Sequence, residues 1–197
     1  VMKPKIGMMQ GRIYPDSMDK LQVFPSKRWE EEFYEAQNIG FDFLELLYEI
    51  GEHQDNPLLK ENSINGLEIL TVKSKLSMVS ICADFFTEYT LLDGGDEMAW
   101  SRLSNLINKA IELTISVIVI PFFSKSAIET KEDLISFLLK AEGLISKASK
   151  VGVHFCIETT LDAVTLYSIL KSTKSKVKIC YDLGNSAAFG FDAPKEI

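Results

Sequence analysis

The sequence predicts an α/β protein in which helices cover a parallel β-sheet. Short apolar runs of β-type recur along the chain, and stretches of helical periodicity lie between most of them. Successive strand starts are about 36 residues apart for five units and closer before the sixth, which is typical of repeated βα units. Apolar strands in such units indicate a sheet that is buried on both faces.

Length, composition and charge limit the function classes. The 197 residues predict one domain, with 46% apolar and 25% charged residues and a net charge of -7. The acidic balance argues against nucleic acid as a partner, because phosphate backbones require a basic surface. No apolar run reaches the roughly 18 residues of a membrane span. The three cysteines show no CxxC spacing, which favours a reducing compartment, and we expect a cytoplasmic protein.

The individual elements can be predicted from periodicity and from helix caps. The expected helix N-caps are Ser26, Thr130 with Asp133 three residues later, and Asp162. The predicted strands are residues 6–10, 41–47, 77–84, 115–121, 153–158 and 177–182, and the predicted helices are residues 29–39, 97–113, 131–150 and 162–171.

Two architectures fit this order of elements, an open doubly wound sheet and a closed (β/α)8 barrel. A glycine-rich phosphate-binding turn after the first strand would favour the open sheet. The first strand is followed instead by Gln10-Gly11-Arg12, so that signal is absent.

Acidic residues end several of the predicted strands. Asp84, Glu158 and Asp182 each follow an apolar run directly, and Glu45 stands in a similar position. In a closed parallel barrel such residues converge on the C-terminal rim, where functional groups are placed. Converging carboxylates repel one another unless a cation neutralises them, and a divalent metal ion does so with oxygen ligands. The alternative is that each acid caps the following helix or pairs with a lysine.

Side-chain alternation predicts which way the acid of the fifth strand points. His154, Cys156 and Glu158 fall on one face, and Val153 and its alternate neighbours fall on the other. We expect the second face to pack on helices and the first to face the barrel interior.

Six short segments carry a resemblance to a known family. They are MMQGRIYP, GFDFLELLYE, SICADFF, VIP, CIETT and CYDLGN, in this order along the chain. With them the sequence resembles the xylose isomerase-like TIM barrels of the sugar isomerase/epimerase superfamily. The resemblance covers the whole chain and implies a (β/α)8 TIM barrel. It also implies that residues 1–197 form a single incomplete domain with about six of the eight βα units.

The resemblance assigns roles to the last two strand ends. Glu158 and Asp182 would be two of four ligands of a divalent metal ion, such as Mn, Mg, Co or Zn. The remaining histidine and glutamate ligands of the family belong to its seventh and eighth strands, beyond this sequence. Gly184 would let the chain turn away from the site, and Asn185 would orient a ligand or contact substrate. Glu158 would also move a proton on one face of the substrate through an enediolate.

Further residues are candidates for substrate binding. Arg12 suits a phosphate or carboxylate through its planar fork, although an ordinary surface role fits equally well. His53 lies in a polar loop above the predicted rim, where a surface role is again the alternative. Asp84 and Glu45 would face the substrate. The presence of only two histidines argues against the apurinic endonuclease branch, whose zinc site is rich in histidine.

The resemblance implies a metal-dependent isomerase or epimerase of a small sugar or sugar phosphate. An inosose-dehydratase-like lyase and a non-catalytic sugar-binding relative are the alternatives. A barrel of six units would expose its first and last strands as edges, so we expect self-association, for example as a homodimer.

Overall fold

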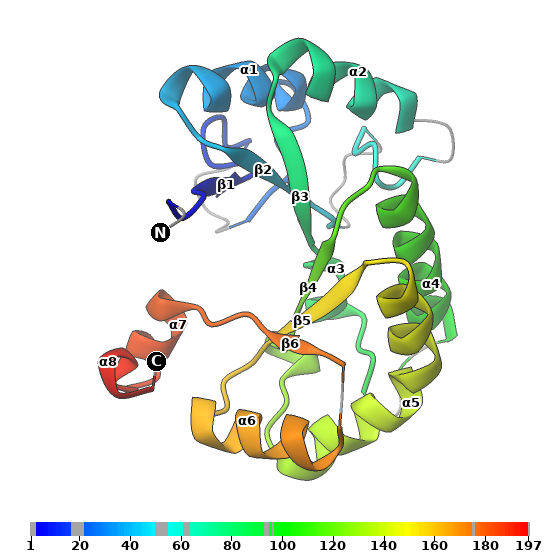
Figure 1. The fold of residues 1–197 in the computed structure, drawn as a ribbon, viewed down its shortest axis with the longest axis vertical. Helices are drawn as coiled ribbons and strands as arrows, with labels where there is room; N and C mark the ends of the chain where they lie inside the picture. The colour runs from blue at the N-terminus through cyan, green and yellow to red at the C-terminus, as the bar shows by residue number, and fades with distance from the viewer. Residues whose placement is uncertain are drawn as a thin grey trace.

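The computed structural model describes residues 3–16, 22–49, 55–60, 64–92, 95, 97–174 and 176–196. It contains one six-stranded parallel sheet whose strands follow the chain order. The sheet curves into a C with helices along its outer side, and the open side of the C lies between the first and last strands (Figure 1). The strands are β1 Gly7–Met9, β2 Phe43–Leu47, β3 Ser77–Cys82, β4 Val117–Pro121, β5 His154–Glu158 and β6 Lys178–Ile179.

The helices alternate with these strands. They are α1 Trp29–Ile39, α2 Ile64–Ser74, α3 Phe85–Glu88, α4 Glu97–Glu112, α5 Lys131–Lys150, α6 Ala163–Ser172, α7 Leu183–Ala188 and α8 Ala193–Glu196, with a 3-10 turn η1 at Ser124–Ser126. The parallel sheet and its strand order confirm the predicted α/β class. The predicted helices at 29–39 and 131–150 have the observed boundaries, whereas α2, α3 and α7 lie outside the predicted helical segments.

The helix caps show which local signals were sufficient. Thr130 begins α5 with a capping box, in which its side chain accepts from the Asp133 N–H and the Asp133 carboxylate accepts from the Thr130 N–H. Asp162 caps α6 by accepting from the Thr165 N–H, as predicted. The prediction for Ser26 is wrong, because α1 begins at Trp29 and the Ser26 hydroxyl donates to Asp16 instead.

The two faces of the sheet have different environments. On β5, Phe155 and Ile157 are 1% and 0% exposed in the core between sheet and helices, whereas Cys156 and Glu158 are only half-buried on the opposite face. This confirms the alternation predicted for the fifth strand. The aromatic residues Phe85, Phe86 and Phe122 also belong to the helix-facing core and are at most 2% exposed.

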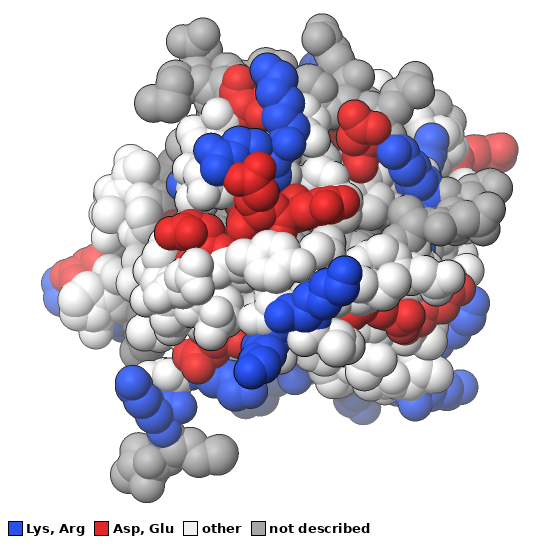
Figure 2. Space-filling view, turned by 90° about the horizontal axis from the view of Figure 1, so that it is seen from above, with Lys and Arg blue, Asp and Glu red and all other residues white. Residues whose placement is uncertain are grey.

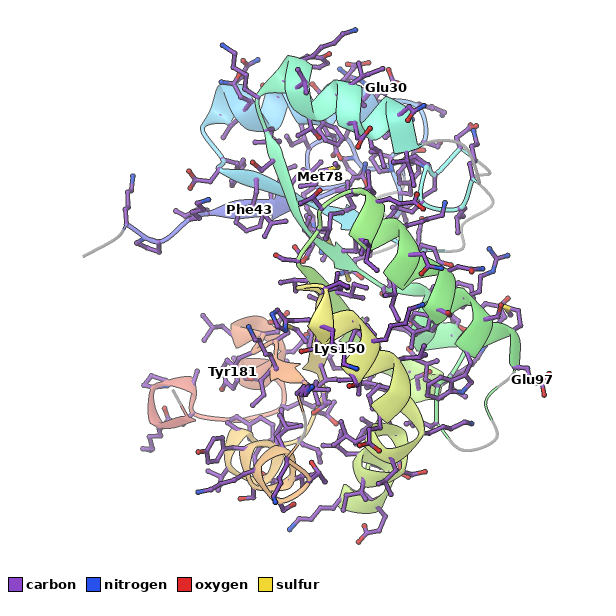
Figure 3. All side chains as sticks on the ribbon, turned by 45° about the vertical axis from the view of Figure 1, so that its right-hand side comes forward. Glu30, Phe43, Met78, Glu97, Lys150 and Tyr181 are labelled. Atoms are coloured by element: carbon purple, nitrogen blue, oxygen red, sulfur yellow. The ribbon has the colours of Figure 1, made fainter. Side chains whose placement is uncertain are left out.

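A cavity lies on the concave face of the sheet, inside the C. It has a volume of about 400 Å³ and is lined by residues of all six strands or the residue directly after them, among them Met9, Glu45, Ser80, Val119, Cys156 and Cys180. Figure 3 labels Phe43 on β2 and Tyr181 just after β6, in the two halves of the C. The Phe43 ring packs directly on Gly7, where a Cβ would lie 2.1 Å from it, so a larger residue at position 7 would displace that ring.

The outer surface carries mixed charges on the side of α1 and α2. Figure 2, which views the molecule from above, shows Lys and Arg side chains interleaved with Asp and Glu, and that face has no uniformly basic area. Within the described residues, no helix is both long enough and apolar enough to cross a membrane.

The difference between the two faces predicts different costs of truncation. Phe155→Ala should destabilise the protein by about 3–5 kcal/mol, because it leaves a cavity in the helix-facing core. Cys156→Ala, one residue later on the concave face, should cost about 1 kcal/mol, since it removes one small half-buried group. Urea unfolding measures both values. Equal losses would contradict the assignment of the two faces.

Candidate functional site

The carboxyl ends of the six parallel strands meet at one edge of the sheet, as the sequence predicts. Glu158 is the last residue of β5, and Asp182 follows the neighbouring strand β6 and precedes α7. These two strands pair directly, with Ile157 opposite Ile179. The two acids therefore lie at the ends of adjacent strands.

Asn185 connects the two carboxylates. Its side-chain amide donates to Glu158 Oε1 at 2.9 Å, and its backbone N–H donates to Asp182 Oδ1 at 2.8 Å. The structure thus brings Glu158, Asp182 and Asn185 together. Asp182 is also the N-cap of α7. The capping role that was the alternative for this acid is therefore real, and it uses one of its two oxygens.

Gly184 has a different role from the expected one. It lies within α7, and its φ is not in the left-handed region that would require glycine. A Cβ at this position would lie 3.2 Å from Asp182 Oδ1, so glycine leaves room for that carboxylate.

The electrostatics of Glu158 reflect this crowding. Burial and the nearby Asp182 together raise the pKa of Glu158 to about 7, and the Asn185 amide opposes the shift. Glu45 and Asp84 also contribute to raising the pKa of Glu158. The other three predicted acids are therefore near enough to affect the charge of Glu158. A group with a pKa near neutrality can both accept and release a proton.

The placement of Glu45 corrects the prediction that it ends its strand. β2 continues to Leu47, so Glu45 lies in the middle of the strand and lines the cavity below the rim. The Ser80 hydroxyl donates to its Oε2 at 2.6 Å. Burial raises the pKa of Glu45, and the bond from Ser80 opposes this shift. The first acid after the end of β2 is Glu49, which was not predicted from the sequence.

Glu49 and Asp84 belong to a second pocket at the rim. This pocket has a volume of about 470 Å³ and is lined by Gln22, Glu49, Asp84, Phe85, Thr87, Glu88, Tyr89 and Lys125. Asp84 makes no side-chain cap bond to α3, and none of the ion pairs among the described residues includes it. Burial, together with Glu49 and Glu88, raises the pKa of Asp84 to about 6.

The two remaining candidates for substrate binding are Arg12 and His53. Arg12 is exposed in the loop after β1, and its guanidinium lies 3.9 Å from Met9 Sδ. Met9 lines the concave cavity, so Arg12 lies above one side of it. His53 lies outside the described residues.

The three cysteines are free thiols. Cys82 is buried, and Cys156 and Cys180 are half-buried along the concave cavity. Burial and the nearby Glu158 and Glu45 raise the pKa of Cys180 to about 12. The cysteines therefore add neutral, weakly polar groups to the floor of the site.

Comparison with known proteins identifies the fold. Neither the protein-family models nor the curated proteins compared with the sequence include a match. Similar solved structures include a sugar phosphate isomerase/epimerase from Parabacteroides distasonis, with a TM-score of 0.68, 13% identity, and coverage of 97% of this chain and 69% of that one. A xylose isomerase-like TIM barrel protein from Mycobacterium smegmatis in complex with magnesium has a TM-score of 0.64, 15% identity, and coverage of 92% and 65%.

A third similar structure is the IolI protein with a bound zinc atom, with a TM-score of 0.65, 14% identity, and coverage of 97% and 67%. The chain has the xylose isomerase-like TIM-barrel fold. It forms six consecutive βα units of that barrel and spans 62–69% of the length of the similar structures. Two of these relatives contain a divalent metal ion.

The pKa of Asp84 predicts a pH-dependent stability. Because the pKa of Asp84 is higher in the folded state, folding favours the protonated carboxyl group. The contribution of Asp84 to the free energy of unfolding is therefore fully present below its ordinary pKa of 3.8 and is lost as the pH rises through its folded-state pKa of about 6. Asp84→Asn cannot ionise. It should match the wild type near pH 4 and exceed it by about 1–2 kcal/mol near pH 8, after allowance for solvent screening.

Urea unfolding at the two pH values measures this difference, and the exposed Glu68→Gln serves as control. A stabilisation by Asp84→Asn that is the same at both pH values would contradict the assigned cause.

Proposed function

We propose that this chain carries part of the active site of a metal-dependent sugar or sugar phosphate isomerase or epimerase. The observation that carries the proposal is the pair Glu158 and Asp182 at the ends of adjacent strands, both bound by Asn185. The fold and the metal ions named in two similar structures support the same reaction class.

The residues present fit a divalent metal ion as a partial donor set. Two carboxylates supply hard oxygen ligands, which suit Mg²⁺, Mn²⁺ or Zn²⁺. None of the ion pairs among the described residues neutralises either acid. Within that part of the chain, no three His, Cys, Asp or Glu side chains form a ready metal cluster. The remaining ligands would come from substrate, water or residues outside the described ranges.

When bound, the metal ion would polarise the oxygens of a sugar carbonyl and its neighbouring hydroxyl. Glu158 then has two tasks on this chain. One of its oxygens accepts from Asn185, which fixes the plane of the carboxylate, and the other remains for the metal ion or for the proton next to the sugar carbonyl. Asp182 has one oxygen committed to α7 and one that can bind metal. Asn185 holds both carboxylates in a fixed relation.

The side chains of the concave cavity shape the space below the proposed metal ligands. Glu45 and Ser80 form a polar pair on the cavity wall, and Val119 and Cys156 present apolar or weakly polar surface. Such a mixture suits a small polyol, which offers hydroxyls to a few polar groups and C–H faces to the rest. Arg12 above Met9 would contact a distal hydroxyl, carboxylate or phosphate of the substrate.

Removal of the proposed ligands should weaken metal binding. Asp182→Asn and Glu158→Gln should each lower Mn²⁺ affinity at least about tenfold, since even outer partners of metal ligands have effects of that size. Titration of the chain with Mn²⁺, followed by the loss of the free-ion EPR signal, measures the affinity. Asp192→Asn is the matched control, because Asp192 precedes the short helix α8 as Asp182 precedes α7. Equal affinities for all three variants and the wild type would rule out this metal site.

Proton exchange tests the reaction class. The protein with Mn²⁺ in D₂O should incorporate deuterium into a free ketose, at the carbon beside the carbonyl, and NMR measures the exchange. Glu158→Gln should abolish the exchange, whereas exposed Glu68→Gln should keep it. Exchange that survives Glu158→Gln would exclude Glu158 as the proton carrier. Loss of water from the sugar would instead indicate a lyase. Metal-dependent binding of the sugar without deuterium exchange would indicate a non-catalytic relative.

A further inference from the structure

The loop after β1 is organised by a carboxylate that belongs to α1. Glu32 Oε2 accepts from the Gly11 N–H at 2.7 Å, and Glu32 Oε1 accepts from the Ile13 and Tyr14 N–H groups, each at 3.1 Å. These bonds join residues 18–21 positions apart in the sequence. One side chain therefore satisfies three of the loop's backbone donors.

Glu32 is completely buried, with 0% of its surface exposed. Burial raises the pKa of its carboxyl group, and the three backbone N–H groups oppose that shift. None of the ion pairs in the described part of the chain includes Glu32. Its charge is therefore held by backbone dipoles, which is a costly arrangement unless those dipoles are fixed in place.

The backbone from Gly11 to Tyr14 has the character of an anion-binding nest. The N–H groups of Gly11, Ile13 and Tyr14 converge on one carboxylate, and Gly11 adopts a φ of 88°. A side chain at Gly11 is excluded, because its Cβ would lie 2.4 Å from the Val23 carbonyl oxygen. The shape of the loop therefore requires glycine at position 11.

Arg12 is carried between the bonded residues Gly11 and Ile13. Its guanidinium lies against Met9 Sδ, and Met9 lines the concave cavity together with Glu45 and Cys156. The other limb of the same loop is tied to the rim, where the Phe24 N–H donates to Glu49 Oε1 at 2.5 Å. Two carboxylates therefore bind this loop, and the buried one, Glu32, accepts from the residues on either side of Arg12.

We propose that Glu32 is a positioning residue, whose buried carboxylate acts as the built-in anion of the Gly11–Tyr14 nest and thereby holds Arg12 at the mouth of the cavity. An effect of Glu32 on substrate binding rests on the proposed function, in which Arg12 contacts the substrate. The effect of Glu32 on the order of the Gly11–Tyr14 loop is independent of that function. Preorganisation of this kind lowers the ordering cost that a binding residue on a free loop would pay.

The experiment removes the anion and then restores it. Glu32→Ala should leave three buried N–H groups without an acceptor and open the loop, and trypsin should cleave after Arg12 at least about tenfold faster. Phenylglyoxal should also modify Arg12 at a changed rate, measured by mass spectrometry. Sodium formate should slow the cleavage again by filling the empty nest, whereas sodium chloride at equal ionic strength should not.

Glu30→Ala is the matched control, since Glu30 lies in the same first turn of α1 but is exposed. It should show wild-type cleavage with no response to formate. Should Glu32→Ala fail to fold, Glu32→Gln provides the same test. Its carbonyl can still accept from Ile13 and Tyr14, but its amide meets the Gly11 N–H, so cleavage should rise without rescue by formate.

Two results would overturn the proposal. One is wild-type cleavage after Arg12 in Glu32→Ala, or in Glu32→Gln if the alanine variant does not fold. The other is an effect of formate on folded Glu32→Ala that is no greater than its effect on Glu30→Ala. Neither readout uses metal or turnover, so a failure of the proposed function would leave these results unchanged, and their failure would leave Glu158 and Asp182 untouched.

Discussion

The burial of carboxylates without basic partners is the constraint on which the concave side of this protein depends. Removing a carboxylate from water is costly, and the cost must be met by donors, by protonation or by a cation. The Glu32 carboxylate accepts hydrogen bonds from three backbone N–H groups, and the Glu45 carboxylate accepts one from the Ser80 hydroxyl. Glu158 has one side-chain amide, from Asn185.

The number of hydrogen-bond donors to each carboxylate separates the structural acid Glu32 from the proposed reactive acid Glu158. Glu32 has three donors and is sealed from solvent, so its charge serves the shape of a loop. Glu158 has one donor, and burial together with the like-charged Asp182 raises its pKa to about 7. A divalent cation between Glu158 and Asp182 would relieve this repulsion, and it is the simplest group that does so with oxygen ligands.

The sequence was sufficient for the parts of the fold that depend on local patterns. The capping box at Thr130 and the apolar periodicity of α5 gave correct boundaries, because both signals lie within a few residues. Helix α2 was not predicted. Its sequence contains Gly66 and two β-branched residues near its end, so its helicity depends on packing of Leu67 and Leu70 against the sheet.

The site was predictable only where its residues follow strand ends in a motif. Glu158, Asp182 and Asn185 were predicted in this way, and the structure places them together. Glu45 was grouped with the acids at strand ends because Phe43-Leu44-Glu45 is similar to their pattern, although the strand predicted at 41–47 already ends at Leu47, as β2 does. Glu32 was missed because its partners are distant in sequence. One signal was available: Glu32 and Ala36 are four residues apart on the same buried face of α1.

The central claim is that Glu158 and Asp182 share a divalent metal ion. Anomalous diffraction from crystals soaked in Mn²⁺ tests it most directly, because it locates the ion without any assumption about substrate. The account predicts one strong peak at roughly 2.0–2.6 Å from a carboxylate oxygen of each residue. A peak bound elsewhere, or none between these two side chains at saturating Mn²⁺, would contradict it.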